Sequence, residues 1–140
     1  MKGFIAATIS VLAAAGSVAA AMHHKRIDHP NAQMSRLDLS KVGKPDDCGH
    51  MLQDDAAAVH ISSKYWRDKQ NCGQWMKMTK GKTVEWALVT GQCKDCADEQ
   101  IATSPAVHGQ FEKDPKKTVN GVTWKFEKMG FNPPGMDECD

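Results

Sequence analysis

The sequence predicts a small, mainly β domain, built as a barrel or sandwich and stabilised by disulfide bonds. Short runs with alternating apolar and polar residues are separated by turn residues, and no stretch has the periodicity of a long helix. Five cysteines in a chain of 140 residues indicate a disulfide framework. We therefore expect five or six short strands with one or two short helices.

The strand predictions rest on alternation and on β-branched or aromatic residues. In the run 72–79, Trp75 and Lys77 fall on one face, and Met76 and Met78 on the other. Gly81 between two lysines predicts a tight hairpin turn, and Asn120-Gly121 predicts a second turn before the last strand. The predicted strands are residues 36–40, 57–62, 72–79, 83–89 and 122–126.

One short helix is predicted after Ser104. A serine cap followed by Pro105 at the first helical position is typical of a helix N-terminus. We expect this helix to end near Phe111.

Residues 1–21 have the pattern of a secretory signal peptide. Lys2 precedes an uncharged apolar run over residues 4–15, and small residues at 18–21 offer a cleavage site. The run is short for a membrane span, although an N-terminal anchor helix is the alternative. We expect a secreted, extracellular protein.

Composition divides the rest of the chain into three parts. Residues 22–35 are polar and aperiodic and predict a flexible segment, in which Lys25-Arg26 is either a dibasic processing site, cut after Arg26, or part of a polar tail. Residues 36–128 form the predicted domain, and residues 129–140 a C-terminal tail.

The charge balance excludes two classes of partner. The formal net charge is +1, and the signal peptide takes Lys2 with it. A nearly neutral chain has no electrostatic footprint for nucleic acid or for an anionic membrane surface.

The cysteines predict structural disulfides, with the pairing left open. Cys48, Cys72, Cys93 and Cys96 lie within the predicted domain, whereas Cys139 lies near the C-terminus and is the candidate for an unpaired or intermolecular cysteine. Cys93-x-x-Cys96 also has the spacing of a redox pair or of half a zinc site. A second pair at zinc spacing is missing, so we expect no metal and no cofactor.

Seven short motifs occur in one order, and together they indicate a family. They are Asp47-Cys48-Gly49, Gln53-Asp54 through Ser62, Asn71-Cys72-Gly73, Gly81-Lys82-Thr83-Val84, Cys93-x-x-Cys96, Ser104-Pro105-Ala106-Val107 and Gly121 through Phe126. They resemble the double-psi β-barrel domain of secreted rare-lipoprotein-A-like, loosenin and barwin-expansin proteins. The firm part of the match covers residues 48–126, with a looser extension to Leu37. The resemblance implies a six-stranded double-psi β-barrel.

The chain departs from this pattern where the family carries acids. The segment before Cys93 is one residue longer and has Thr90-Gly91 where the family often has an aspartate, and Ala56 and Ala102 replace two further aspartates. The family's aromatic pair on the first strand is replaced near Leu39-Ser40. In lytic relatives such an aspartate is the general acid for sugar cleavage. The departures predict that this chain is not an enzyme.

Aromatic and acidic residues supply the candidate ligand contacts. Tyr65, Trp66 and Trp75 are the aromatic candidates, because flat rings stack on sugar faces. Alternation places Trp86 and Trp124 in the core. Asp95 and Asp98 are the acidic candidates and, with Glu99, could form a relocated acid pair.

Two functions follow as hypotheses. The first is a small secreted non-catalytic protein that binds cell-wall polysaccharide or an extracellular or host partner. The alternative is a polysaccharide-active enzyme, lytic or loosening, that uses a relocated acid pair. We expect a monomer, with a covalent dimer through Cys139 as a further option.

Overall fold

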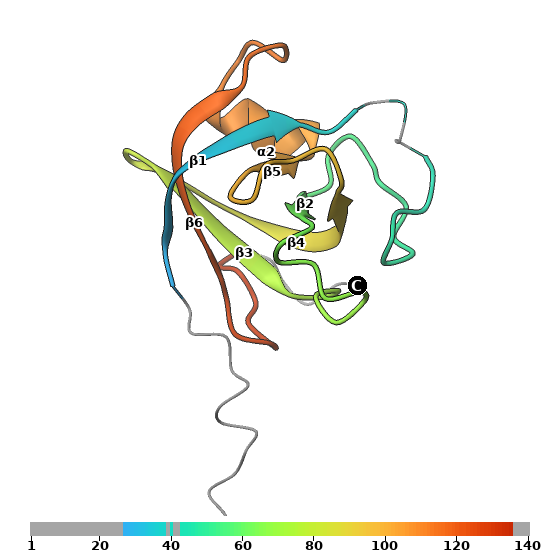
Figure 1. The fold of residues 1–140 in the computed structure, drawn as a ribbon. Coiled ribbons are helices and arrows are strands. Elements are labelled where there is room, and N and C mark those ends of the chain that lie inside the picture. Colours follow the sequence, from blue (N-terminus) through green and yellow to red (C-terminus); the bar gives the residue numbers. More distant parts are fainter. Residues whose placement is uncertain (1–26, 39, 41–42, 136–140) are drawn as a thin grey trace, which may run out of the picture.

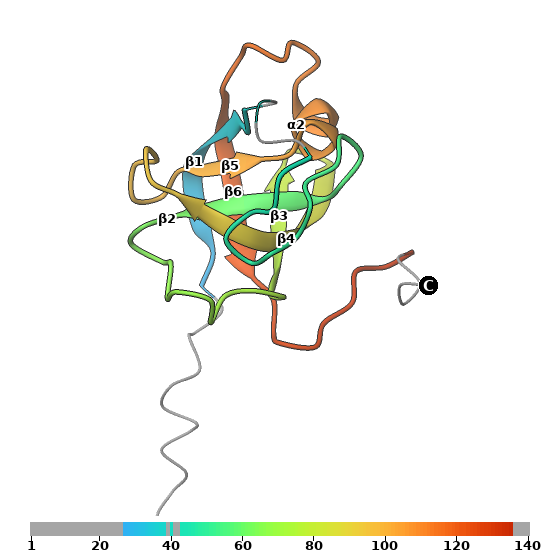
Figure 2. The same cartoon turned by 90° about the vertical axis from the view of Figure 1, so that its right-hand side faces the viewer.

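Six strands close into a barrel in the computed structural model, which describes residues 27–38, 40 and 43–135 (Figure 1). The neighbours around the barrel are β1-β5-β2-β4-β3-β6, and α2 lies beside the barrel, in contact with β4 and β1 (Figure 2). This confirms the predicted mainly β, six-stranded barrel. The elements are β1 (His29–Arg36), β2 (Ala58–Ser62), β3 (Trp75–Lys80), β4 (Thr83–Cys93), β5 (Ile101–Thr103), α2 (Pro105–Phe111) and β6 (Val119–Phe126).

Two of the strand pairs are parallel, and one of them positions the site. β1 runs parallel to β5, and β2 runs parallel to β4, while the other neighbours are antiparallel. In the β2–β4 pair, His60 lies opposite Gly91 and Ser62 opposite Cys93. Parallel strands end at the same edge of a sheet, so the loops after β2 and β4 leave the barrel together.

The barrel interior is filled by long apolar side chains. Met76 and Met78 of β3 are fully buried there with Trp124 of β6. This confirms the predicted alternation of β3 and the core position of Trp124. Trp86 was predicted for the core, but this is wrong. Ala87 and Val89 are the buried residues of β4, and Trp86 lies half-buried on the outer face. Alternation identifies two faces of a strand but does not say which one is buried.

The first strand differs from its prediction. β1 begins at His29, inside the segment expected to be flexible, and it ends at Arg36, where the first strand was expected to begin. Its sequence is mostly polar, but Ala32 and Met34 point into the core and both edges are paired. Closure of the barrel, which is a tertiary effect, makes this polar stretch a strand.

Two further strand details were not predicted. β5 has only three residues and was not expected. Asn120-Gly121 was expected to be a turn, but both residues lie within β6. Gly121 has φ = +72°, and the β1–β6 register shifts twice in this region, so the glycine serves a bulged strand.

The predicted helix is confirmed, but its cap works differently. α2 begins at Pro105 and ends at Phe111. Ser104 makes no side-chain capping bond; its Oγ accepts a hydrogen bond from Ala58 N (3.1 Å) and donates one to Ala56 O. The serine therefore ties the helix to the start of β2.

Two disulfides join the four cysteines of the barrel. Cys48 pairs with Cys72, and Cys93 pairs with Cys96. Cys139, the predicted signal peptide and the Lys25-Arg26 pair lie outside the described residues. In the part of the chain that the structure describes, no helix is long and apolar enough to cross a membrane.

Candidate ligand-binding groove

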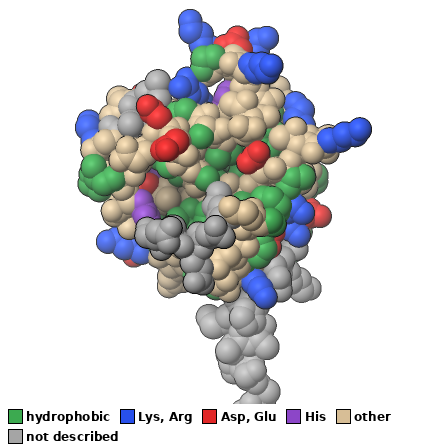
Figure 3. All heavy atoms as spheres, turned by 180° about the vertical axis from the view of Figure 1, so that it is seen from behind, with side chains coloured by type: hydrophobic (Ala, Val, Ile, Leu, Met, Phe, Trp, Pro, Cys, Tyr) green, Lys and Arg blue, Asp and Glu red, His purple; other side chains and the backbone are tan. Residues whose placement is uncertain are grey.

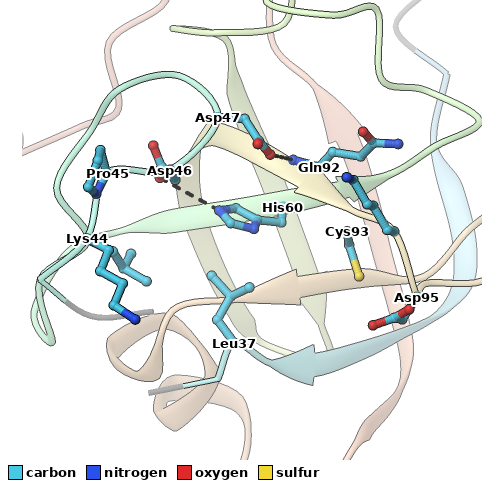
Figure 4. A pocket seen from close by; sticks show the side chains of 11 residues that line it. Leu37, Lys44, Pro45, Asp46, Asp47, His60, Gln92, Cys93 and Asp95 are labelled. Atoms are coloured by element: carbon cyan, nitrogen blue, oxygen red, sulfur yellow. Dashed lines mark hydrogen bonds and ion pairs between the residues drawn. The ribbon is translucent and has the colours of Figure 1, made fainter. Parts of the chain in front are cut away.

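A groove of about 490 Å³ lies beside the ends of β2 and β4 (Figure 4). The loop that follows β1 forms one wall, and the residues at the end of β4 form the other. The side chains lining it are Leu37, Lys44, Pro45, Asp46, Asp47, Leu52, His60, Gln92, Cys93, Lys94 and Asp95.

The loop that forms the first wall is held against the barrel by covalent and hydrogen bonds. The Cys48–Cys72 disulfide anchors it, and Cys48 N donates to Thr90 O of β4 at 3.0 Å. Within the loop, Gly43 N donates to Leu52 O at 2.9 Å. These bonds fix the two aspartates that precede Cys48 over the end of β4.

Gly91 allows this close approach. A Cβ atom at this position would lie 2.8 Å from His60 Nε2 and 2.9 Å from Asp47 Oδ2, closer than real Cβ contacts. A side chain at this position would displace the buried His60 ring and the Asp47 carboxylate, which glycine leaves in place. The sequence resemblance predicts an acid at Thr90-Gly91, and at Gly91 the space next to the backbone holds these two side chains.

The two loop aspartates are engaged in structural contacts. Asp46 Oδ2 lies 3.7 Å from His60 Nε2, and the two side chains are only 7% and 4% exposed. Asp46 Oδ1 accepts a hydrogen bond from His50 N at 3.0 Å. Asp47 Oδ2 accepts one from Gln92 N at 2.7 Å, which ties the loop to the end of β4.

The other two replaced acids belong to an apolar cluster. Ala56 and Ala102 pack with Leu37 and Leu52, and these leucines line the groove. The three places at which the resemblance predicts acids therefore lie next to residues that line one groove.

The candidate acids of the relocated pair are not brought together. Asp95 is exposed and lines the groove. Asp98 is exposed outside it, and its backbone carbonyl accepts a hydrogen bond from Ser62 Oγ. Glu99 lies in a separate network with Tyr65 and His29.

None of the three aromatic candidates lines the groove. Tyr65 and Trp66 were expected to be surface residues, but both are half-buried and pack against the core. Their loop follows β2, and Tyr65 N and Trp66 N both donate to Ser62 O at 3.1 Å, which turns the rings back onto the barrel. Trp75 is half-buried on the outer face of β3.

Sequence reasoning did not single out the polar centre of the groove. Asp46, Asp47 and His60 meet at Gly91 only through the parallel β2–β4 register and the loop disulfide. The available signal was the departure at Gly91 together with the Asp47-Cys48-Gly49 motif.

A second polar cluster holds the start of β1. His29 Nδ1 lies 2.8 Å from Glu99 Oε2, and Tyr65 Oη donates to Glu99 Oε1 at 2.5 Å. The His29 ring stacks on Trp124 with 3.9 Å between centroids, and Lys64 Nζ donates to Glu99 Oε1 at 3.0 Å. This cluster joins β1, β6 and the loops after β2 and β4.

Glu99 is the charged centre of this second cluster. Partial burial raises the pKa of Glu99, but hydrogen bonds from Tyr65, Lys64 and His29 outweigh burial and set the pKa below its ordinary value. Burial, with the neighbouring carboxylate, raises the pKa of Tyr65. Within the described residues, no group of three or more His, Cys, Asp or Glu side chains could hold a metal ion.

Charges of both signs occur on the face that Figure 3 shows. Figure 3 shows lysine, arginine and acidic side chains interspersed over the back of the molecule. This agrees with the small net charge of +1.

Comparison with known proteins identifies the architecture. No family model and no curated protein sequence matches the chain. Among solved structures, the Streptomyces papain inhibitor is similar with a TM-score of 0.62 at 19% identity, over 73% of this chain and 96% of the inhibitor. The chain has the double-psi β-barrel fold of the expansin and barwin type.

A bacterial expansin supports the same conclusion. The apo expansin of Clavibacter michiganensis has a TM-score of 0.64 at 14% identity over 76% of this chain. A variant of that expansin in complex with cellohexaose has a TM-score of 0.57, also at 14% identity and over 76% of this chain. The chain spans about half of the expansin, 54% of its length, so the likeness concerns the barrel.

Proposed function

We propose that this protein is a secreted, non-catalytic binding module whose groove takes a segment of cell-wall polysaccharide. The observation that carries the proposal is the centre of the groove. Gly91 stands near the position of the family's acid, in contact with His60 and Asp47, and both aspartates of the loop are engaged in holding the wall.

The arrangement of acids argues against glycoside hydrolysis. Cleavage of a glycosidic bond generally needs two carboxyl groups on either side of the bond. Asp46 is buried against His60, whereas Asp47 and Asp95 are both exposed lining acids. Asp47 Oδ2 accepts a hydrogen bond from Gln92 N that holds the loop against β4. We therefore assign Asp47 a structural role, which leaves Asp95 as the acid that binds a ligand hydroxyl group.

The remaining lining suits a ligand rich in hydroxyl groups. Lys44, Gln92, Lys94 and Asp95 present donors and acceptors around the groove, and Leu37 and Leu52 give it an apolar floor. The similar expansin variant was solved in complex with cellohexaose, so a protein that contains a barrel of this type can bind a glucan.

The test compares two exposed acids from one loop. Asp95→Ala removes the groove acid, whereas Asp98→Ala removes a neighbouring acid outside the groove and is the matched control. We expect the wild-type protein to sediment with insoluble cellulose or chitin without releasing reducing sugar. Asp95→Ala should weaken binding several-fold, and Asp98→Ala should leave it unchanged. Sugar release by the wild type that Asp95→Ala abolishes would overturn the non-catalytic proposal.

A protein partner is the second candidate, because none of the described residues that line the groove is an aromatic on which a sugar could stack. Its lysines and aspartates would suit a polypeptide with charges of both signs. The similar papain inhibitor, matched over 96% of its length, supports this candidate. Failure to bind any glycan, combined with stoichiometric inhibition of papain, would favour the second candidate over the first.

Secretion belongs to the same proposal. The two disulfides fit an oxidising compartment, and the N-terminal pattern fits a cleaved signal peptide. N-terminal sequencing of the protein recovered from the medium would place cleavage after residue 21 or after Arg26. Retention of the uncleaved N-terminus in a membrane fraction would contradict this.

A further inference from the structure

The outer face of the β3–β4 hairpin carries two tryptophans. Trp75 pairs with Leu88 and Lys77 pairs with Trp86, so the two indoles are diagonal neighbours on one face. Both indoles are half-buried, and Val84 on the same face is among the exposed large hydrophobic residues. The aromatic face is defined here as Trp75, Trp86, Leu88 and Val84. It lies outside the groove.

A polar atom within this face lacks a partner. Trp86 Nε1 is buried and has no hydrogen-bond acceptor among the described residues. A buried donor left without an acceptor costs about 1–3 kcal/mol. The N–H group of Trp86 therefore lacks an acceptor in this conformation, and water or a ligand hydroxyl could supply one.

Part of the C-terminal segment packs on this face. The strap is defined here as residues 128–135, which follow β6. The ring of Phe131 lies against Trp86 with 6.3 Å between centroids and an interplanar angle of 31°, and Pro133 is buried. The indole is thus already in tilted contact with an apolar ring.

The strap is held by packing and not by backbone pairing. Its hydrogen bond among the described residues is local, from Phe131 N to Lys128 O at 3.1 Å. The last backbone bond to the barrel comes before it, from Glu127 N to Trp75 O at 2.8 Å. A segment attached in this way opens at a lower cost than a strand of the barrel.

We propose that the aromatic face is a second polysaccharide-binding site, which the strap covers and a sugar chain displaces. A pyranose ring would take the place of the Phe131 ring on Trp86, and a sugar hydroxyl would accept the hydrogen bond of Trp86 Nε1. Lys77, whose Nζ lies 5.7 Å from the centre of the Trp86 ring, would donate to a further hydroxyl. The choice of ligand rests on the proposed function, whereas the covered site rests on the contacts of Trp86.

Phe131→Ala in the full-length chain tests the cover. The apparent affinity of a covered site equals its intrinsic affinity multiplied by the fraction of molecules in which the site is open. If the strap is open in about one fifth of the molecules, uncovering the site should raise the affinity for cellohexaose or chitohexaose about fivefold. Met129→Ala is the matched control, because Met129 lies in the same strap and is 61% exposed. The gain should disappear in Phe131→Ala/Trp86→Ala. An affinity equal to that of the wild type, or a gain that survives loss of Trp86, would overturn the proposal.

Two further measurements separate this site from the groove and from a folding defect. Phe131→Ala/Asp95→Ala should keep the fivefold gain over Asp95→Ala, because Asp95 lies in the groove and not on the aromatic face. In the unmodified protein, the indole N–H resonance that is missing from Trp86→Phe should shift on addition of cellohexaose or chitohexaose. If it stays in place while groove resonances shift, the aromatic-face site is wrong and the groove proposal stands.

Discussion

At the scale of single residues, Gly91 determines how closely the Asp47 and His60 side chains approach β4. The loop with Asp47 and the imidazole of His60 both approach to within 3 Å of the position that a Cβ would take. A larger side chain at this place would need the His60 ring and the Asp47 carboxylate to move.

Alanine at Gly91 should measure the tightness of this contact. We expect Gly91→Ala to lower the free energy of unfolding by about 1–3 kcal/mol, because the added methyl overpacks a fixed wall. Gly109→Ala is the control, since Gly109 lies in α2 with open space around it and should gain about 0.5–1 kcal/mol. Urea denaturation of both variants checks this. Equal stability of Gly91→Ala and the wild type would show that the loop is not held against β4.

Glu99 should give the fold a dependence on acid pH. Its hydrogen bonds lower the pKa of the folded carboxyl, so the stabilisation is present above the unfolded pKa and is lost as the pH falls through the folded pKa. We expect Glu99→Gln to cost about 1 kcal/mol at pH 7, a modest value because the side chain is partly exposed. Thermal unfolding from pH 7 to pH 3 should show the two curves converging in acid. Asp98→Asn is the control, and a constant difference at every pH would contradict the role of the charge.

Residue identity alone predicted only part of the candidate site. Asp95 reached the groove because it follows β4 directly. Tyr65 and Trp66 are in a polar stretch of sequence, yet they pack on the core because their loop turns back at Ser62. His60 became part of the groove through its register with Gly91, which is a contact between residues distant in sequence and is not visible in a linear pattern.

At the scale of elements, the sequence was most informative where alternation was strict. The alternation of β3 and the Pro105 helix start were predicted closely, and the structure adds that Met76 and Met78 face the core. β1 was missed because its polar residues form a strand only when both neighbours are in place. The inner face of β4 was predicted wrongly because Ala87 is small, and the large Trp86 on the opposite face suggested burial.

The two disulfides should contribute unequally to stability. Cys48–Cys72 closes a sequence separation of 24 residues and Cys93–Cys96 one of 3. Loop entropy then predicts a loss of about 3 kcal/mol for the Cys48→Ser/Cys72→Ser variant and about 2 kcal/mol for Cys93→Ser/Cys96→Ser.

Guanidinium unfolding of both double variants, with glycan binding measured in parallel, checks this order. The Cys48 pair anchors the groove wall, so its loss should also weaken binding. A larger loss of stability from the Cys93 pair would show that local strain or residual structure outweighs loop length.

At the scale of the whole molecule, the barrel joins the ends of the domain. β1, which the sequence did not predict, pairs with β6, the last predicted strand, and this pairing closes the barrel. This explains why the fold class was predictable while the start of the domain was not. The seven motifs in order indicate the fold, but closure of the barrel also needs β1, a polar strand that lies in none of the motifs.

Cys139 provides the last prediction about the molecule as a whole. The four cysteines of the barrel are paired with one another, so Cys139 is the odd member of the five. An odd cysteine in an oxidising compartment favours an intermolecular bond. We expect a monomer under reducing conditions and a disulfide-linked dimer on oxidation. The dimer should appear as a band of twice the monomer mass on a non-reducing gel. Reductant and Cys139→Ser should each abolish that band, while Cys139→Ser should retain the unfolding free energy of the wild type because the barrel disulfides are intact. Identical monomer bands with and without reductant would exclude the dimer and leave Cys139 as a free thiol or as one capped by a small molecule, which mass spectrometry of the intact protein would distinguish.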